Sequence, residues 1–333
     1  MGKTNEGIAM YLPMYRKGST QSDSELEELA HRVFETQNII YVPDPDRALR
    51  AALFGLGMGP GCDILVPAFG QWTPGPDVAG VGARPSYVDV GPELVLNAKN
   101  LEQKIESDYS LQDGNLVHRR KGNLLRGVVM THPAGYSPFV DEVEEFAEKW
   151  NLALFDDARG ALTSRCWSTS RCRWIYPGVV GQAGVVSLYD VAFFVARDHD
   201  LLSAVSQHTS PPSETSICRA KELLENLNAE RLENARTRQN IVTALAGLNL
   251  GKVIPAPTWS EPGVPLALLV CQDRNSAADQ LEDMGFSVET EIWPQSVLEK
   301  EGNQFSYRRN KCELSEELSR KAIIVGLGSV NLA

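Results

Sequence analysis

The chain has 333 residues, 43% of them hydrophobic, and a formal net charge of −11 at pH 7. That length accommodates one large domain and a smaller one, each with an ordinary apolar core. The negative charge argues against nucleic acid or an anionic membrane surface as the main partner, because both select clusters of Lys and Arg. No apolar run reaches the roughly 20 residues that span a bilayer. The N-terminus also lacks the layout of a signal peptide, so we expect a cytoplasmic protein.

The first half of the chain alternates between helical and extended patterns. Apolar residues recur at helical spacing behind Ser24, which can cap a helix over residues 24–33. Short apolar runs bounded by turn residues predict strands, and longer periodic stretches predict helices. The predicted strands cover residues 38–42, 64–67, 83–89, 127–131 and 152–155, and the further helices cover residues 47–56 and 140–150. This alternation indicates an α/β layered sheet.

A change in composition marks a domain boundary near residues 210–213, which read Ser-Pro-Pro-Ser. A long charged helix over about residues 215–246 is predicted to follow. We therefore expect a large α/β domain over residues 1–212 and a small C-terminal α/β domain over residues 213–333. Within the small domain, the patterns predict strands over residues 264–271 and 286–292 and a helix over residues 273–284.

Three ordered motifs resemble one known family. They are Leu-Gly-Met-Gly-Pro-Gly-Cys-Asp-Ile-Leu-Val-Pro-Ala-Phe at residues 56–69, Val-Gly-Ala-Arg-Pro-Ser-Tyr-Val-Asp-Val at residues 81–90, and Leu-Phe-Asp-Asp-Ala-Arg-Gly-Ala at residues 154–161. Their order and spacing are similar to those of the DegT/StrS-type sugar aminotransferases, which are fold-type I pyridoxal-phosphate enzymes. The resemblance implies a large domain with a mostly parallel seven-stranded sheet, a small C-terminal α/β domain, and a dimer whose active sites lie at the subunit interface.

The resemblance also locates the turn that holds the cofactor phosphate. In the family this turn reads Ser-Gly-Thr and uses backbone N–H groups and the dipole at the start of a helix. Counting back from the glycines of the first motif places Asp44, Pro45 and Asp46 at this turn. Asp44 can cap the helix itself, Pro45 removes an N–H donor, and Asp46 adds negative charge where the phosphate would lie. We therefore predict a self-capped helix that excludes a phosphate.

The family's Schiff-base lysine follows a serine by five residues, which places the serine at Ser187 and the lysine position at Ala192. No lysine occurs between Lys149 and Lys221. Aldimine chemistry needs this amine to tether the cofactor and to move the substrate proton. We therefore predict that the pyridoxal-phosphate site is lost and that the chain holds no cofactor. The alternatives are an engineered replacement of lysine by Ala192, and a pyridoxamine-dependent relative in which His199 replaces the lysine.

Other positions of the family's site keep polar or aromatic side chains. Asp157 matches the carboxylate that pairs with the pyridine nitrogen, and it ends a predicted strand, where sites in such sheets form. Gln71 stands where the family stacks an aromatic ring, and Trp72 is adjacent. His132 also follows a strand and is a candidate general base. Each has a structural alternative, which is backbone hydrogen bonding for Asp157, packing for Trp72 and an interior role for His132.

One stretch is basic and aromatic within this acidic chain. Residues 164–176 read Ser-Arg-Cys-Trp-Ser-Thr-Ser-Arg-Cys-Arg-Trp-Ile-Tyr. Arg165, Arg171 and Arg173 could clamp a carboxylate or phosphate, and Trp167 and Trp174 could stack on a planar ligand or insert into a partner. A solvated loop with anchoring aromatic residues is the alternative. The six cysteines of the chain contain no Cys-x-x-Cys pair, so we predict neither a disulfide framework nor a metal site.

Together these features favour a degenerate aminotransferase-family protein that serves as an accessory or regulatory subunit in a sugar or secondary-metabolite pathway. Its expected partner is a second copy of the chain or an active aminotransferase paralogue, and a small anionic metabolite is a candidate ligand. One alternative is a cofactor-independent enzyme that acts on a small polar or nucleotide-linked metabolite in a remodelled cleft. Another is a pyridoxamine-phosphate-dependent sugar aminotransferase or dehydratase relative with an altered site. Fold alone does not choose among them.

Overall fold

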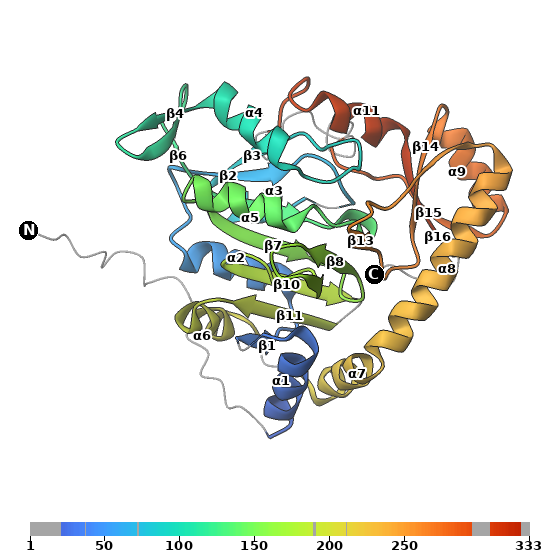
Figure 1. Cartoon of the computed structure of the whole chain (residues 1–333), viewed down its shortest axis with the longest axis horizontal. Coiled ribbons are helices and arrows are strands. Elements are labelled where there is room, and N and C mark those ends of the chain that lie inside the picture. The colour runs from blue at the N-terminus through green and yellow to red at the C-terminus, as the bar shows by residue number, and fades with distance from the viewer. Residues whose placement is uncertain are drawn as a thin grey trace, which may run out of the picture.

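The computed structural model describes residues 21–36, 38–71, 73–188, 191–210, 212–294 and 307–327. A large sheet lies at its centre (Figure 1). Along the order β1-β11-β10-β7-β6-β2-β3, only β11 pairs antiparallel with its neighbours. The strands are β1 (Ile39–Tyr41), β2 (Cys62–Pro67), β3 (Arg84–Val88), β6 (Leu124–Thr131), β7 (Ala153–Ala158), β10 (Ala183–Leu188) and β11 (Val191–Ala196). The expected fold class, with a large and mostly parallel sheet, is confirmed, and β4 (Tyr109–Gln112) and β5 (Asn115–His118) bring the seven strands of this order to nine.

Helices cover both faces of this sheet, which explains why its strands read as continuous apolar runs. Ile64 and Val66 of β2 pack toward α2 (Pro45–Gly55), α3 (Gly75–Gly80) and α6 (His199–His208). Leu65 lies between them in sequence and packs on the opposite face, toward α4 (Ala98–Asp108) and α5 (Val140–Lys149). This alternation follows from the pleat of a strand. Among the described residues, no helix is both long and apolar enough to cross a membrane.

Two hairpins were not predicted. The strands β4 (Tyr109–Gln112) and β5 (Asn115–His118) form the first, which joins the large sheet where Val117 pairs with Leu124 at the start of β6. The second consists of β8 (Arg165–Ser168) and β9 (Arg173–Ile175), and β13 (Ser260–Glu261) extends it to three strands. The basic and aromatic stretch is therefore a hairpin and not a solvated loop.

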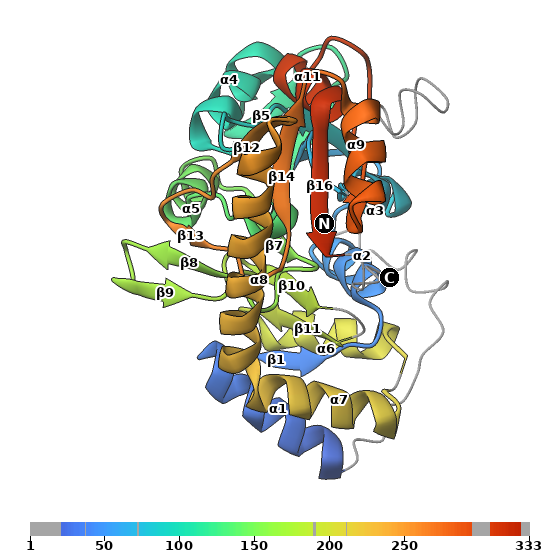
Figure 2. The ribbon, with the colours of Figure 1, turned by 90° about the vertical axis from the view of Figure 1, so that its right-hand side faces the viewer.

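The predicted long charged helix is two helices, α7 (Glu214–Glu225) and α8 (Leu227–Leu248). They meet at Asn226, whose side chain donates a hydrogen bond of 2.9 Å back to the carbonyl of Glu222. Side-chain bonds of this kind compete with helix propagation, which accounts for the wrong prediction of one helix. α7 lies beside α1 (Gln21–Phe34), and α8 continues to the C-terminal sheet (Figure 2).

The C-terminal sheet has the order β12-β14-β16-β15, and all of its pairs are antiparallel. Its strands are β12 (Gly251–Ile254), β14 (Ala267–Cys271), β15 (Phe286–Glu289) and β16 (Ala322–Leu327), with helices α9 (Arg274–Asp283) and α11 (Glu313–Lys321). Asp89, which follows β3, accepts hydrogen bonds from the backbone N–H groups of Leu314 (2.9 Å) and Ser315 (2.8 Å). A residue of the large domain thus caps α11 and ties the two sheets together.

Candidate functional site

The candidate site lies at the edge of the large sheet where the parallel strands β2, β6, β7 and β10 end. In open α/β sheets, ligands bind outside this edge. The N-termini of α2 and α3 face the same edge, because each helix follows a strand that ends there or nearby. Asp157 is the second-last residue of β7, and its side chain is fully buried.

Arg159 connects this strand end to both helices. Its Nε donates to Oδ1 of Asp157 (2.8 Å) and its Nη2 to Oδ2 of the same carboxylate (2.6 Å). Nη2 also lies 3.0 Å from Oδ2 of Asp77 in α3, and Nη1 donates to Asp46 in the first turn of α2. We call these four residues the Arg159 cluster. One guanidinium therefore holds a strand end and two helix starts together.

The charged groups of the Arg159 cluster shift the pKa of Arg159 and that of Asp77. Burial by itself would lower the pKa of Arg159, but the carboxylates of Asp157, Asp77 and Asp46 raise it, so Arg159 remains a cation. The pKa of Asp77 is raised to about 6, mainly by burial, while Arg159 lowers it and repulsion from Asp157 and Asp46 raises it further. Three carboxylates thus share one fully engaged guanidinium, and Arg50 lies 3.6 Å from Asp77 as a more distant second cation.

The turn at Asp44, Pro45 and Asp46 forms the start of α2 as predicted. Asp44 is the N-cap, and its carboxylate accepts a hydrogen bond of 2.9 Å from the backbone N–H of Arg47. Pro45 occupies the first helical position and has no N–H to offer. The expected self-capped helix is confirmed, and one of the donors that an anion would need at this terminus is already satisfied.

Ser187 and Ala192 pair with each other across β10 and β11. The hydroxyl of Ser187 accepts a hydrogen bond of 3.1 Å from the backbone N–H of Gly160. Ala192 is 2% exposed and packs in the apolar cluster that α2 forms with the sheet. His199 begins α6 beyond the last residue of β11, at the opposite edge of the sheet, so it lies away from Ala192.

His132 lies inside the protein with both ring nitrogens engaged. Nε2 is 2.6 Å from Oδ1 of Asp156, and Nδ1 is 2.9 Å from the hydroxyl of Ser137. Asp156 and Asp157 are consecutive residues of β7, so their side chains point to opposite faces of the sheet. His132 is therefore separated from the Arg159 cluster, and its fully buried ring fits the interior role and not that of a general base at this site.

The predicted arginine clamp does not form, because each guanidinium faces a different carboxylate. Arg165 pairs with Glu261 at 2.8 Å, Arg171 with Glu144 at 2.6 Å, and Arg173 with Glu35. Two tryptophans of the same hairpin, Trp167 and Trp174, contact each other edge to face with ring centres 5.8 Å apart. Gln71 is partly buried near the strand ends, and Trp72 lies outside the described residues.

Two residues of the Arg159 cluster were missed at the sequence level. Arg159 stands within the Asp-Asp-Ala-Arg-Gly-Ala motif, two residues after Asp157 and on the same side of the chain, so its approach to that carboxylate could have been inferred. Asp77 carries no comparable signal, because it reaches the cluster only through the position of α3 in space.

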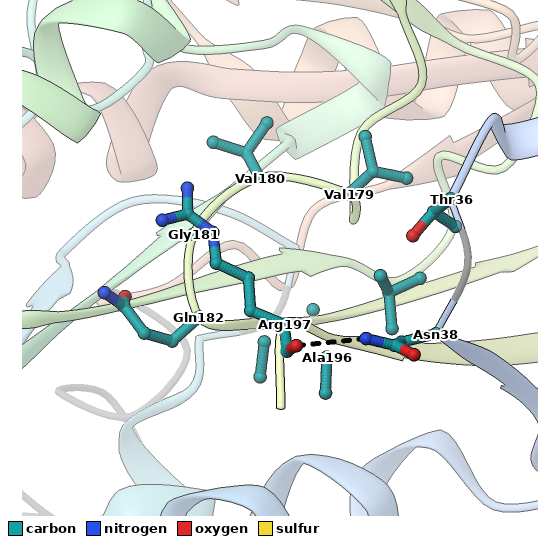
Figure 3. A pocket seen from close by; sticks show the side chains of 11 residues that line it. Thr36, Asn38, Val179, Val180, Gly181, Gln182, Ala196 and Arg197 are labelled. Atoms are coloured by element: carbon teal, nitrogen blue, oxygen red, sulfur yellow. Dashed lines mark hydrogen bonds between the residues drawn. The ribbon is translucent and has the colours of Figure 1, made fainter. Parts of the chain in front are cut away.

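A pocket of about 260 Å³ lies at the opposite edge of the sheet, around the start of β10 and the end of β11 (Figure 3). Its polar groups are engaged with each other and with a neighbour. Asn38 Nδ2 donates to the carbonyl of Arg197 (3.0 Å), and the Arg197 guanidinium pairs with Glu144 (3.0 Å). Within the described ranges, no three His, Cys, Asp or Glu side chains are grouped to hold a metal ion.

Solved structures define the class of fold. An aminotransferase of the DegT DnrJ EryC1 StrS type from Brucella abortus superposes with a TM-score of 0.74 at 19% identity, covering 92% of this chain and 85% of that chain. The aminotransferase TlmJ from Streptoalloteichus hindustanus gives a TM-score of 0.73 at 16% identity, covering 95% and 88%. The fold is therefore that of the fold-type I aminotransferases.

The sequence comparisons identify the family within this class. The model of the DegT/DnrJ/EryC1/StrS aminotransferase family matches residues 14–193. A UDP-4-amino-4-deoxy-L-arabinose–oxoglutarate aminotransferase from Shewanella sediminis is 26% identical over 139 residues, a stretch that covers 42% of this chain and 32% of that protein. The chain belongs to the DegT/DnrJ/EryC1/StrS aminotransferase family.

Proposed function

We propose that this chain is a degenerate member of its family that does not carry out lysine-dependent pyridoxal-phosphate transamination. The observation that carries the proposal is the Arg159 cluster. Asp157 and Asp46 stand at the two positions that, by the family resemblance, contact the pyridine nitrogen and the phosphate of the cofactor. The guanidinium of Arg159 bridges these two carboxylates. The Arg159 side chain thus occupies both carboxylates at the positions that would contact the cofactor.

The remaining residues of the site do not fit the cofactor either. Asp46 adds a carboxylate at the start of α2, where the phosphate would lie, and Asp44 already accepts a hydrogen bond from the backbone N–H of Arg47. Ala192 offers no amine for a Schiff base, and its 2% exposure leaves no open space at the lysine position.

The chain retains the fold of its family but has an altered cofactor site, and this combination favours a non-catalytic role as an accessory or regulatory subunit. The large sheet keeps complete apolar clusters on both faces, and the C-terminal sheet is tied to it through Asp89. In fold-type I enzymes the active sites lie between subunits, so a silent chain can still complete or regulate an active neighbour. The partner through which this role acts is an active aminotransferase paralogue, in a pathway that handles sugar-linked metabolites, and a second copy of the chain can occupy the same dimer surface.

Neither alternative is favoured by an observation among the described residues. A cofactor-independent enzyme needs accessible acid–base or anion-binding groups. His132 is buried, however, and each arginine of the basic hairpin already faces a carboxylate. A pyridoxamine-dependent relative would need His199 near Ala192, but the two lie at opposite edges of the sheet.

Titration with pyridoxal phosphate tests the loss of the cofactor site. The absorbance of the protein between about 300 and 500 nm is recorded with increasing cofactor, next to an active family member as the positive control. We expect no saturable band from this chain. A saturable band would contradict the proposal. This holds even if borohydride reduction attaches no cofactor to lysine peptides, because the band would then show specific non-covalent binding.

Co-expression with an aminotransferase encoded beside this chain tests the accessory role. Size-exclusion chromatography with light scattering should give a stable hetero-oligomer, and the partner's activity should change when this chain is present. If the chain forms only homodimers and leaves the activity of the aminotransferase unchanged, the accessory role is wrong even where the cofactor titration is negative.

A further inference from the structure

A second pocket, of about 480 Å³, lies along the free edge of β3, the outermost strand of the large sheet. Residues from β3, α4, the turn between β5 and β6 and the segment before α11 line it. Among the described lining residues, the only carboxylate is Asp108. The cationic ones are Arg84, Lys104, Arg119, Arg120, Lys121, Arg308 and Lys311. We call it the basic pocket, and it stands out in a chain with a net charge of −11.

Several of these cations are not neutralised within the protein. Arg84 pairs with the buried Asp63, and Lys104 pairs with Asp108 at 2.8 Å. Arg120, Lys121 and Arg308 are exposed and form no ion pair with any carboxylate of the described residues. The basic pocket therefore keeps an excess of positive charge that can attract an anion.

The turn that carries two of these cations is held in place before any ligand binds. His118 Nδ1 accepts hydrogen bonds from the backbone N–H groups of Arg120 (3.1 Å) and Lys121 (3.2 Å). The pKa of His118 is lowered, mainly by burial and secondly by the positive charge of Arg84. The neutral ring can accept these hydrogen bonds. Gly122 closes the turn with a φ of +72°, in the left-handed region that favours glycine. A turn fixed in this way loses little entropy on binding.

The size of the basic pocket and the distribution of its cations indicate the class of ligand. Its volume lies within the range of small-molecule sites, which is about 300–1,000 Å³. Arg120, Lys121 and Arg308 bring three positive charges without a carboxylate partner among the described residues, and a diphosphate group, with more negative charge than a single phosphate, neutralises them more fully. The buried rings of Tyr87 and Tyr307, whose centres are 4.9 Å apart and which meet edge to face, form part of the wall of the cavity. We propose that the basic pocket binds a small molecule that carries a diphosphate group.

The proposal is tested by isothermal titration of the full chain with inorganic pyrophosphate, ADP and orthophosphate at low ionic strength. We expect pyrophosphate or ADP to bind at least about ten times more tightly than orthophosphate. Tighter binding of ADP would assign the site to nucleoside diphosphates, and binding of pyrophosphate alone to a free diphosphate. The double variant Arg120→Glu, Lys121→Glu should weaken either ligand at least about ten-fold.

A matched control separates this site from the net charge of the chain. The variant Arg236→Glu, Lys252→Glu changes the net charge equally at exposed positions that do not line the basic pocket, and it should bind as the unaltered chain does. The proposal is overturned if neither diphosphate binds, if orthophosphate binds equally well, or if the two double variants behave alike. These outcomes are independent of the cofactor titration, because the basic pocket and the Arg159 cluster lie at different places on the sheet.

Discussion

Replacement of Arg159 by alanine is expected to lower the free energy of unfolding by about 3–5 kcal/mol, the usual cost of breaking a buried ion pair from one side. The size of this loss depends on how exposed the partner carboxylates are. The side chain of Asp157 is 0% exposed and that of Asp77 is 11% exposed, so both carboxylates would lose their cation in a poorly hydrated place. Asp46 is 57% exposed, and its share is below about 1 kcal/mol because water replaces the lost contact.

The variant Arg173→Ala is a matched control. Arg173 also pairs with a carboxylate, but its side chain is 44% exposed and that of Glu35 is 64% exposed, so we expect a loss below about 1 kcal/mol. Urea unfolding at pH 7, followed by circular dichroism, measures both variants against the unaltered chain. If Arg159→Ala costs no more than Arg173→Ala, the Arg159 cluster is not the buried connection between α2, α3 and β7 that we describe.

Three further predictions concern the same regions. Burial raises the pKa of Asp77 to about 6, so its contribution to stability is fully present below about pH 4 and is lost as the pH rises through 6. Relative to Asp77→Asn, the unaltered chain should therefore lose up to about 3 kcal/mol between pH 4 and pH 7 in urea unfolding, while the exposed control Asp279→Asn shows no such trend. Ala192→Lys should lower the stability by at least about 1–3 kcal/mol, because the site is already packed, and an unchanged melting temperature would contradict this. Asp89→Ala should speed hydrogen exchange in α11 roughly five-fold, the equivalent of about 1 kcal/mol for a lost cap, without affecting β7.

The sequence patterns predicted β1, β2, β3, β6 and β7 of the large sheet, because these strands are largely buried and read as apolar runs, but they did not predict β10 and β11. The sequence also predicted the cap at Asp44, which is a local feature. The β4–β5 hairpin was missed although Asp113 and Gly114 form a two-residue turn with positive φ at both positions, a recognised hairpin signal. The break at Asn226 depends on one side-chain bond, and an apolar pattern does not show it.

The candidate site was harder to predict than the fold, because its contacts are long-range. The sequence predicted the start of α2 at Asp44, Pro45 and Asp46, but not that Arg159 reaches Asp46 across 113 positions of sequence. Likewise, the basic hairpin suggested a clamp because the acidic partners of its arginines lie in other elements, such as Glu144 in α5 and Glu261 in β13. Charge pairing is decided by tertiary structure, which composition does not encode.

The Arg159 cluster also affects how the stability of this chain depends on its surroundings. A diffusible ligand that joins a helix to a sheet stabilises the folded state only while its free concentration exceeds its dissociation constant. Arg159 makes the connection between α2, α3 and β7 as part of the covalent chain, so dilution or starvation cannot remove it. In this region the folded state should keep the same stability whatever the supply of cofactor in the cell.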